Sequence, residues 1–74
     1  MKRKVPEIVL QAGQKTLSLL KGKIVYLGEK DGFTYYILNT NATYGEYPFI
    51  YRYDGKTAQE MSGRLALEIE ESLR

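Results

Sequence analysis

The sequence predicts an α+β domain in which a three-stranded antiparallel meander carries two helices packed on one of its faces, in the order α-β-β-β-α. Three observations lead to this prediction. An Asp-Gly pair divides residues 23–40 into two runs rich in β-branched and aromatic residues, which is a strong hairpin signal. The segments on either side carry apolar residues at helical spacing. The chain has 74 residues and no cysteine, so we expect one small domain, residues 1–74, without disulfides.

The first predicted element is a helix over residues 6–21. Pro6 suits the first helical turn, and Lys21 and Gly22 supply a basic last turn and a C-cap. Gly13, in the middle, costs about 1 kcal/mol relative to alanine. The apolar residues fall on one side of the helix, which is expected to face the sheet. That side carries Val5, Ile8, Val9, Ala12, Leu19 and Leu20.

The predicted hairpin turns at Asp31 and Gly32. A two-residue turn fixes the register of both strands, so that Lys30 lies opposite Phe33. The following pairs are then Glu29–Thr34, Gly28–Tyr35, Leu27–Tyr36, Tyr26–Ile37, Val25–Leu38 and Ile24–Asn39. In this register both faces of the hairpin are largely apolar, whereas a sheet face in contact with water normally alternates with polar residues. Residues 39–46 are expected to form a loop.

A third strand is predicted over residues 47–54, with Pro48 near its start as suits an edge strand. Asp54 and Gly55 are interpreted as its end. Thr57 and Glu60 have the spacing of a capping box, which predicts that the last helix begins here. The apolar stripe of this helix is expected to comprise Ala58, Met61, Leu65, Ala66, Ile69 and Leu73.

If both helices cover one face of the sheet, the other face stays open. The covered face is expected to hold Ile24, Tyr26, Tyr35, Ile37, Phe49 and Tyr51. An open apolar face of this size usually marks an interaction site. We therefore predict a non-catalytic protein-interaction or regulatory module that self-associates as a homodimer, because a second copy would enlarge a small core. Another protein is the alternative occupant. The predicted partner-binding residues are Val25, Leu27, Tyr36, Leu38, Ile50 and Arg52.

The alternative prediction is a nucleic-acid-binding protein. Residues 1–30 hold seven basic and two acidic side chains, whereas residues 31–74 hold four basic and seven acidic ones. A basic surface binds phosphates in a salt-dependent way that ignores sequence, and exposed tyrosines can stack on bases. Residues 1–4 are expected to form a flexible basic arm. The residues predicted to contact nucleic acid are Lys2, Arg3, Lys4, Lys15, Lys21 and Lys23.

Enzymatic activity is not predicted. The chain has no histidine and no cysteine, which removes most routes to acid–base, thiolate and zinc chemistry. The acidic residues are assigned to turns, a cap or solvated positions, so no catalytic residue, cofactor, metal site or small-molecule substrate is expected. No stretch approaches the roughly 18 apolar residues of a membrane helix. The cysteine-free composition suits a cytoplasmic location.

Overall fold

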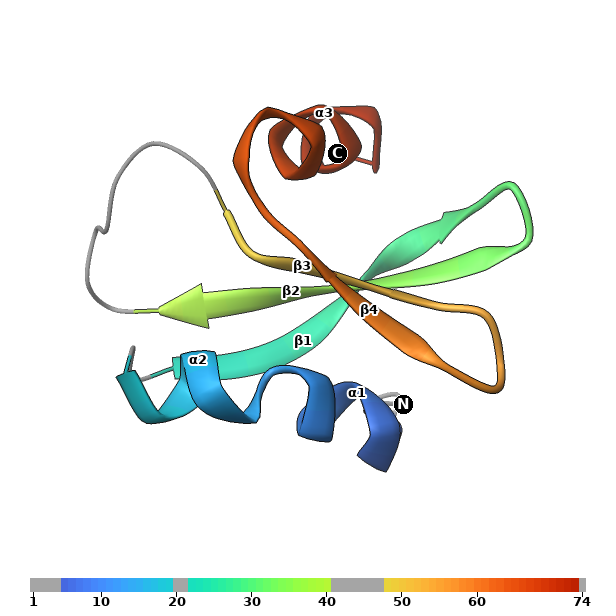
Figure 1. The fold of residues 1–74 in the computed structure, drawn as a ribbon. Helices are drawn as coiled ribbons and strands as arrows, with labels where there is room; N and C mark the ends of the chain where they lie inside the picture. Colours follow the sequence, from blue (N-terminus) through green and yellow to red (C-terminus); the bar gives the residue numbers. More distant parts are fainter. Residues whose placement is uncertain (1–4, 20–21, 41–47, 74) are drawn as a thin grey trace.

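A computed structural model of the chain describes residues 5–19, 22–40 and 48–73. Within these residues lie three helices and four strands. The helices are α1 (Glu7–Ala12), α2 (Gln14–Leu19) and α3 (Gly63–Leu73), and the strands are β1 (Gly22–Lys30), β2 (Phe33–Thr40), β3 (Ile50–Tyr53) and β4 (Ala58–Met61). The strands form one antiparallel sheet in the order β1-β2-β3-β4 (Figure 1). The predicted α+β class is confirmed, but the sheet has four strands rather than three.

The predicted N-terminal helix is divided at Gly13 into α1 and α2. Residues 20–21, its predicted end, lie outside the described residues. Gly13 is buried, and a Cβ atom built on it would lie only 2.8 Å from Ile24 Cδ1 and from Cζ and the hydroxyl oxygen of Tyr51. A glycine is found inside this helical segment because only a residue without a side chain allows so close an approach to the sheet.

The β1–β2 hairpin turns at the predicted position. Asp31 and Gly32 have φ angles of 54° and 82°, and a type I′ turn requires positive values at both positions. The register next to the turn is also confirmed, with Lys30 opposite Phe33 and Gly28 opposite Tyr35.

Beyond Gly28 the predicted pairing was wrong by one residue. A β-bulge between Tyr26 and Gly28 places Tyr26 opposite Tyr36, and Ile24 opposite Leu38. The bulge adds one residue to β1 without a counterpart on β2, so the side chains before it move to the other face of the sheet. Ile24 and Tyr26 therefore share a face with Tyr36 and Leu38.

The prediction that both helices lie on one face of the sheet was also wrong. Figure 1 shows α1 and α2 on one side of the sheet and α3 on the other. The buried cluster under α1 and α2 comprises Val9, Ile24, Tyr36, Leu38 and Tyr51. The cluster under α3 comprises Tyr35, Ile37, Ile50 and Ala66. Both faces of the sheet are apolar, and a helix on each face removes both from water.

Residues 58–61 form strand β4, whereas the sequence predicted the first turn of a helix there. Asp54 Oδ1 accepts hydrogen bonds from the backbone N–H groups of Lys56 (2.8 Å) and Thr57 (2.7 Å). Gly55 has a φ of 101°, and the N–H of Asp54 donates to the carbonyl of Thr57 at 3.2 Å. Thr57 therefore closes a hairpin turn instead of capping a helix, and α3 begins at Gly63.

Candidate functional site

The open apolar face predicted from the sequence is absent from the described residues. Tyr36, Leu38 and Ile50 are only 4%, 6% and 0% exposed. Tyr36 and Leu38 lie in the cluster under α1 and α2, whereas Ile50 lies in the cluster under α3. The structure thus places these three predicted partner-binding residues in the core of the monomer, on both faces of the sheet.

The other three predicted partner-binding residues lie near the surface. Leu27 is half-buried and packs against the cluster under α3. The guanidinium of Arg52 lies 4.7 Å from the centre of the Phe33 ring and donates a 2.7 Å hydrogen bond to Gln59 Oε1, so it is engaged within its own sheet. Val25 is 37% exposed. Among the six, Val25 is therefore the most exposed apolar side chain.

Val25 lies on β1, which is an outer strand of the sheet. Its neighbour Ile24 pairs with Leu38, and the N–H of Leu38 donates to the carbonyl of Phe49 at 3.0 Å, on the β3 side of the hairpin. In an antiparallel ladder, opposed residues alternate between pairs that hydrogen-bond to each other and pairs whose backbone groups point away from each other. Because the backbone of Leu38 bonds on the β3 side, Ile24 and Leu38 form a non-hydrogen-bonded pair. The backbone N–H and C=O of Ile24 therefore point away from the sheet.

The candidate functional site is the outer side of residues 22–26, which we call the β1 edge. Gly22, Lys23 and Val25 are exposed along it. The bulge after Tyr26 interrupts the regular strand, and bulges are one of the features that limit the pairing of a sheet edge with other chains. The opposite outer strand is β4; α1 packs against β4, and α3 packs against β1.

The residues predicted to contact nucleic acid are only partly described. Lys15 on α2 and Lys23 on β1 are exposed. The other four lie outside the described residues, so the predicted basic surface stays a prediction. They are Lys2, Arg3, Lys4 and Lys21.

One hydrogen-bonded side-chain cluster has the composition of an acid–base site. Glu60 Oε2 accepts 2.7 Å hydrogen bonds from the hydroxyl groups of Tyr51 and Thr16. Burial, and then the bond to Glu60, raise the pKa of Tyr51 well above its ordinary value, so this phenol keeps its proton at neutral pH. The cluster joins α2 to β3 and β4.

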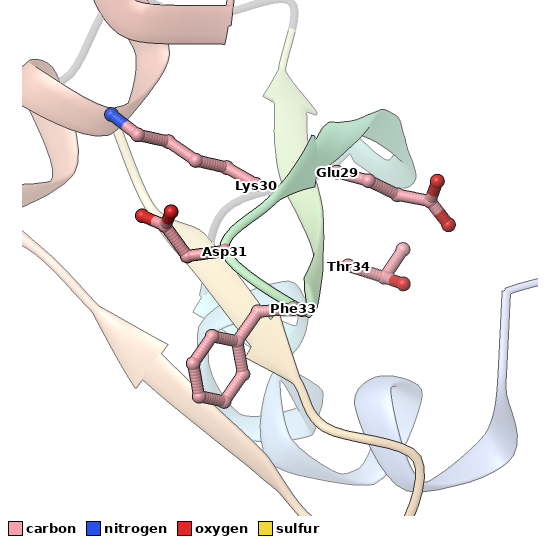
Figure 2. A pocket seen from close by; sticks show the side chains of 6 residues that line it. Glu29, Lys30, Asp31, Phe33 and Thr34 are labelled. Atoms are coloured by element: carbon pink, nitrogen blue, oxygen red, sulfur yellow. The ribbon is translucent and has the colours of Figure 1, made fainter.

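A shallow hollow of about 330 Å³ surrounds the tip of the β1–β2 hairpin. Figure 2 shows that its side chains diverge, with Lys30 and Asp31 on one side of the hairpin and Glu29 and Thr34 on the other. The amine of Lys30 donates to Ser72 Oγ on α3 at 2.5 Å. Because no functional groups converge here, the hollow lacks the form of a substrate site.

The described residues show neither a metal-binding cluster nor a membrane-spanning helix. These residues contain no group of three or more Asp, Glu, His or Cys side chains placed to hold a metal ion. Among their helices, none is both long enough and apolar enough to cross a membrane.

The sequence contained one signal for the bulge that defines the β1 edge. Gly28 lies inside a predicted strand, and a glycine at such a position often marks a bulge. A Cβ atom at Gly28 would lie 3.2 Å from Leu73 Cδ2, so the lack of a side chain at this position leaves room for α3. Comparison with known proteins adds no further guide to function: no family model, curated protein or solved structure matches the chain.

Proposed function

We propose that this protein is a small, non-catalytic protein-interaction module that binds an extended partner strand along the β1 edge. The observation that carries this proposal is the outward-facing backbone of Ile24 beside the exposed side chain of Val25. An added strand would bond to the backbone groups of this edge, and alternate side chains would contact Lys23 and Val25.

The surroundings of the β1 edge support binding rather than catalysis. The polar groups at the hairpin tip diverge, and the Tyr51–Glu60 pair ties elements of the fold together. Strand addition needs none of the His or Cys chemistry that the sequence lacks. A cytoplasmic location is part of the same proposal, since a cysteine-free chain needs no oxidising compartment to fold.

The proposal is tested by titrating isotope-labelled protein with a short model peptide of alternating valine and threonine, followed through its amide NMR signals. We expect progressive shifts confined to residues 22–26 and their neighbours on β2. Val25→Lys should weaken these shifts. Leu65→Lys, at a residue of α3 that is 55% exposed, should leave them unchanged. Shifts that are absent, or confined to another element, would contradict the proposal.

A second titration checks the nucleic-acid alternative with mixed-sequence single-stranded and duplex DNA. Under the proposal, the signals of Lys15 and Lys23 stay in place at low and at moderate salt. Shifts of these two signals that salt reverses would favour nucleic-acid binding instead, because phosphate contacts weaken steeply as salt rises.

A further inference from the structure

We propose that α2 is a releasable segment, which leaves the sheet and unfolds while α1, α3 and the sheet stay folded. A latch holds the segment in place, namely the hydrogen bond from the Thr16 hydroxyl to Glu60 on β4. This inference goes beyond the proposed function, because it does not involve the β1 edge.

The two N-terminal helices differ in burial. Val9 of α1 is 0% exposed, and α1 packs against β3 and β4. In α2 no residue is buried, and Leu19 at its end is 79% exposed. A helix as short as α2 is not stable on its own in water, so α2 depends on its contacts with the sheet. Because these contacts bury little apolar surface, the release of α2 costs little hydrophobic stabilisation.

Gly13 sets the boundary of the releasable segment. Its backbone lies close against the sheet, since a Cβ atom there would be 2.8 Å from Ile24 Cδ1 and from Tyr51 Cζ. This contact anchors the end of α1. On the other side of the boundary, the N–H of Leu17 donates to the carbonyl of Gly13 at 2.8 Å, and this hydrogen bond breaks when α2 unfolds.

The latch joins α2 to the outer strand β4. Thr16 Oγ1 donates to Glu60 Oε2 at 2.7 Å, and the half-buried Leu17 packs against the cluster under α1 and α2. Glu60 Oε2 also accepts a hydrogen bond from Tyr51, which is 0% exposed and stays in the core when α2 leaves. The carboxylate therefore keeps one partner in the released state, which limits the cost of breaking the latch.

Release turns α2 into extended chain that carries Lys15. Proteases cleave extended chain, so the rate of cleavage after Lys15 reports the population of the released state when cleavage is slower than reclosing. Arg52 provides the internal reference. It lies on β3, which has β2 on one side and β4 on the other, so we expect cleavage after Arg52 only when the sheet unfolds.

Limited proteolysis of the full chain with trypsin, followed by mass spectrometry, measures the initial rates of both cuts. Each rate is divided by the rate for a synthetic peptide with the same sequence around the bond. We expect the cut after Lys15 to be at least tenfold faster than the cut after Arg52. A cut after Lys15 that is no faster would overturn the proposal.

A variant of α3 separates the release of α2 from global unfolding. Ala66→Gly removes a buried methyl group of α3 and should speed the cut after Arg52 several-fold. The cut after Lys15 should keep its rate, because α3 remains folded in the released state. Equal acceleration of both cuts would overturn the proposal, since α2 would then open only together with the whole fold.

The latch itself is tested by removing the hydroxyl of Thr16. Thr16→Val keeps the shape of the side chain and should speed the cut after Lys15 about tenfold, as expected for the loss of a hydrogen bond to a charged group. Ser18→Ala is the matched control, because the Ser18 hydroxyl donates to the carbonyl of Lys15 within α2 at 2.7 Å, and it should not speed the cut. An unchanged rate in Thr16→Val, or equal acceleration in both variants, would overturn the assignment of the latch.

Discussion

Position 13 requires glycine because of its close contact with the sheet, which the helix propensities of the segment do not predict. On an isolated helix, replacing glycine with alanine gains about 1 kcal/mol. In the folded chain the same position faces Ile24 and the ring of Tyr51, and an added Cβ atom would lie 2.8 Å from both. The close approach of the helical segment to the sheet therefore favours glycine at this position, although alanine has the higher helix propensity.

Gly13→Ala should destabilise the protein by about 1–3 kcal/mol, the usual range for overpacking a core. The measurement is urea-induced unfolding. Ser18→Ala, at an exposed position of α2, is the control and should cause little change or a small gain. An increase in stability for Gly13→Ala would mean that the contacts of Gly13 relax easily.

At the scale of elements, the chain contains two Asp-Gly pairs, and the sequence predicted a hairpin turn at only one of them. Asp31 and Gly32 were correctly predicted as a hairpin turn. Asp54 and Gly55 are followed by Thr57 and Glu60, whose capping-box spacing favoured a helix. In the structure β4 pairs with β3 along its whole length. Its backbone thus gains sheet hydrogen bonds, which outweigh the local preference for a helix.

Asp54 should control the stability of the β3–β4 turn in a pH-dependent way. Backbone hydrogen bonds from Thr57 and then Lys56 lower the pKa of Asp54 below its ordinary value of 3.8. The folded state therefore favours the carboxylate. Its stabilising contribution is complete above 3.8 and is lost as pH falls through the lower pKa of the folded protein.

Thermal unfolding between neutral and acidic pH tests this prediction. Asp54→Ala should lower the melting temperature at neutral pH and remove part of its decline in acid. Asp54→Asn is the matched control, because the amide oxygen still accepts a hydrogen bond but does not titrate. An NMR titration that places the pKa of Asp54 at or above 3.8 would contradict the prediction.

At the scale of the whole molecule, one carboxylate joins parts that lie far apart in the sequence. Glu60 accepts hydrogen bonds from Tyr51, nine residues away, and from Thr16, 44 residues away. It therefore fastens the N-terminal helical layer to the sheet. Burial, together with the bond to Glu60, raises the pKa of Tyr51 above its ordinary value of 10.0.

Tyr51→Phe should cost about 1.5 kcal/mol at neutral pH, as expected for a hydrogen bond to a charged group. In the unfolded chain Tyr51 loses its proton near pH 10, whereas in the folded protein it keeps it. The stabilising contribution of this phenol is therefore present below pH 10.0 and is lost as pH rises above it. Urea unfolding across this range should show a smaller alkaline loss for the variant. Equal losses in both proteins would contradict the prediction.

The placement of the helices also changes where a partner can bind. The sequence predicted an open sheet face that included Tyr36, Leu38 and Ile50, and the structure buries all three. With a helix on each face, the backbone of an outer strand is the accessible part of the sheet. The proposed interaction therefore moves from a face to the β1 edge.

The sequence alone determined those features that depend on residues close together in the chain. Asp31 and Gly32 specify their turn and the first pairs of the hairpin, because positive φ angles are a local property of those residues. The apolar character of both hairpin faces was likewise visible in the sequence. Tertiary structure decided the bulge beside Gly28, the strand at residues 58–61 and the face that each helix covers. These features depend on residues far apart in the sequence, such as Leu73 beside Gly28 and Glu60 bonded to Tyr51, and a local sequence pattern does not record such contacts.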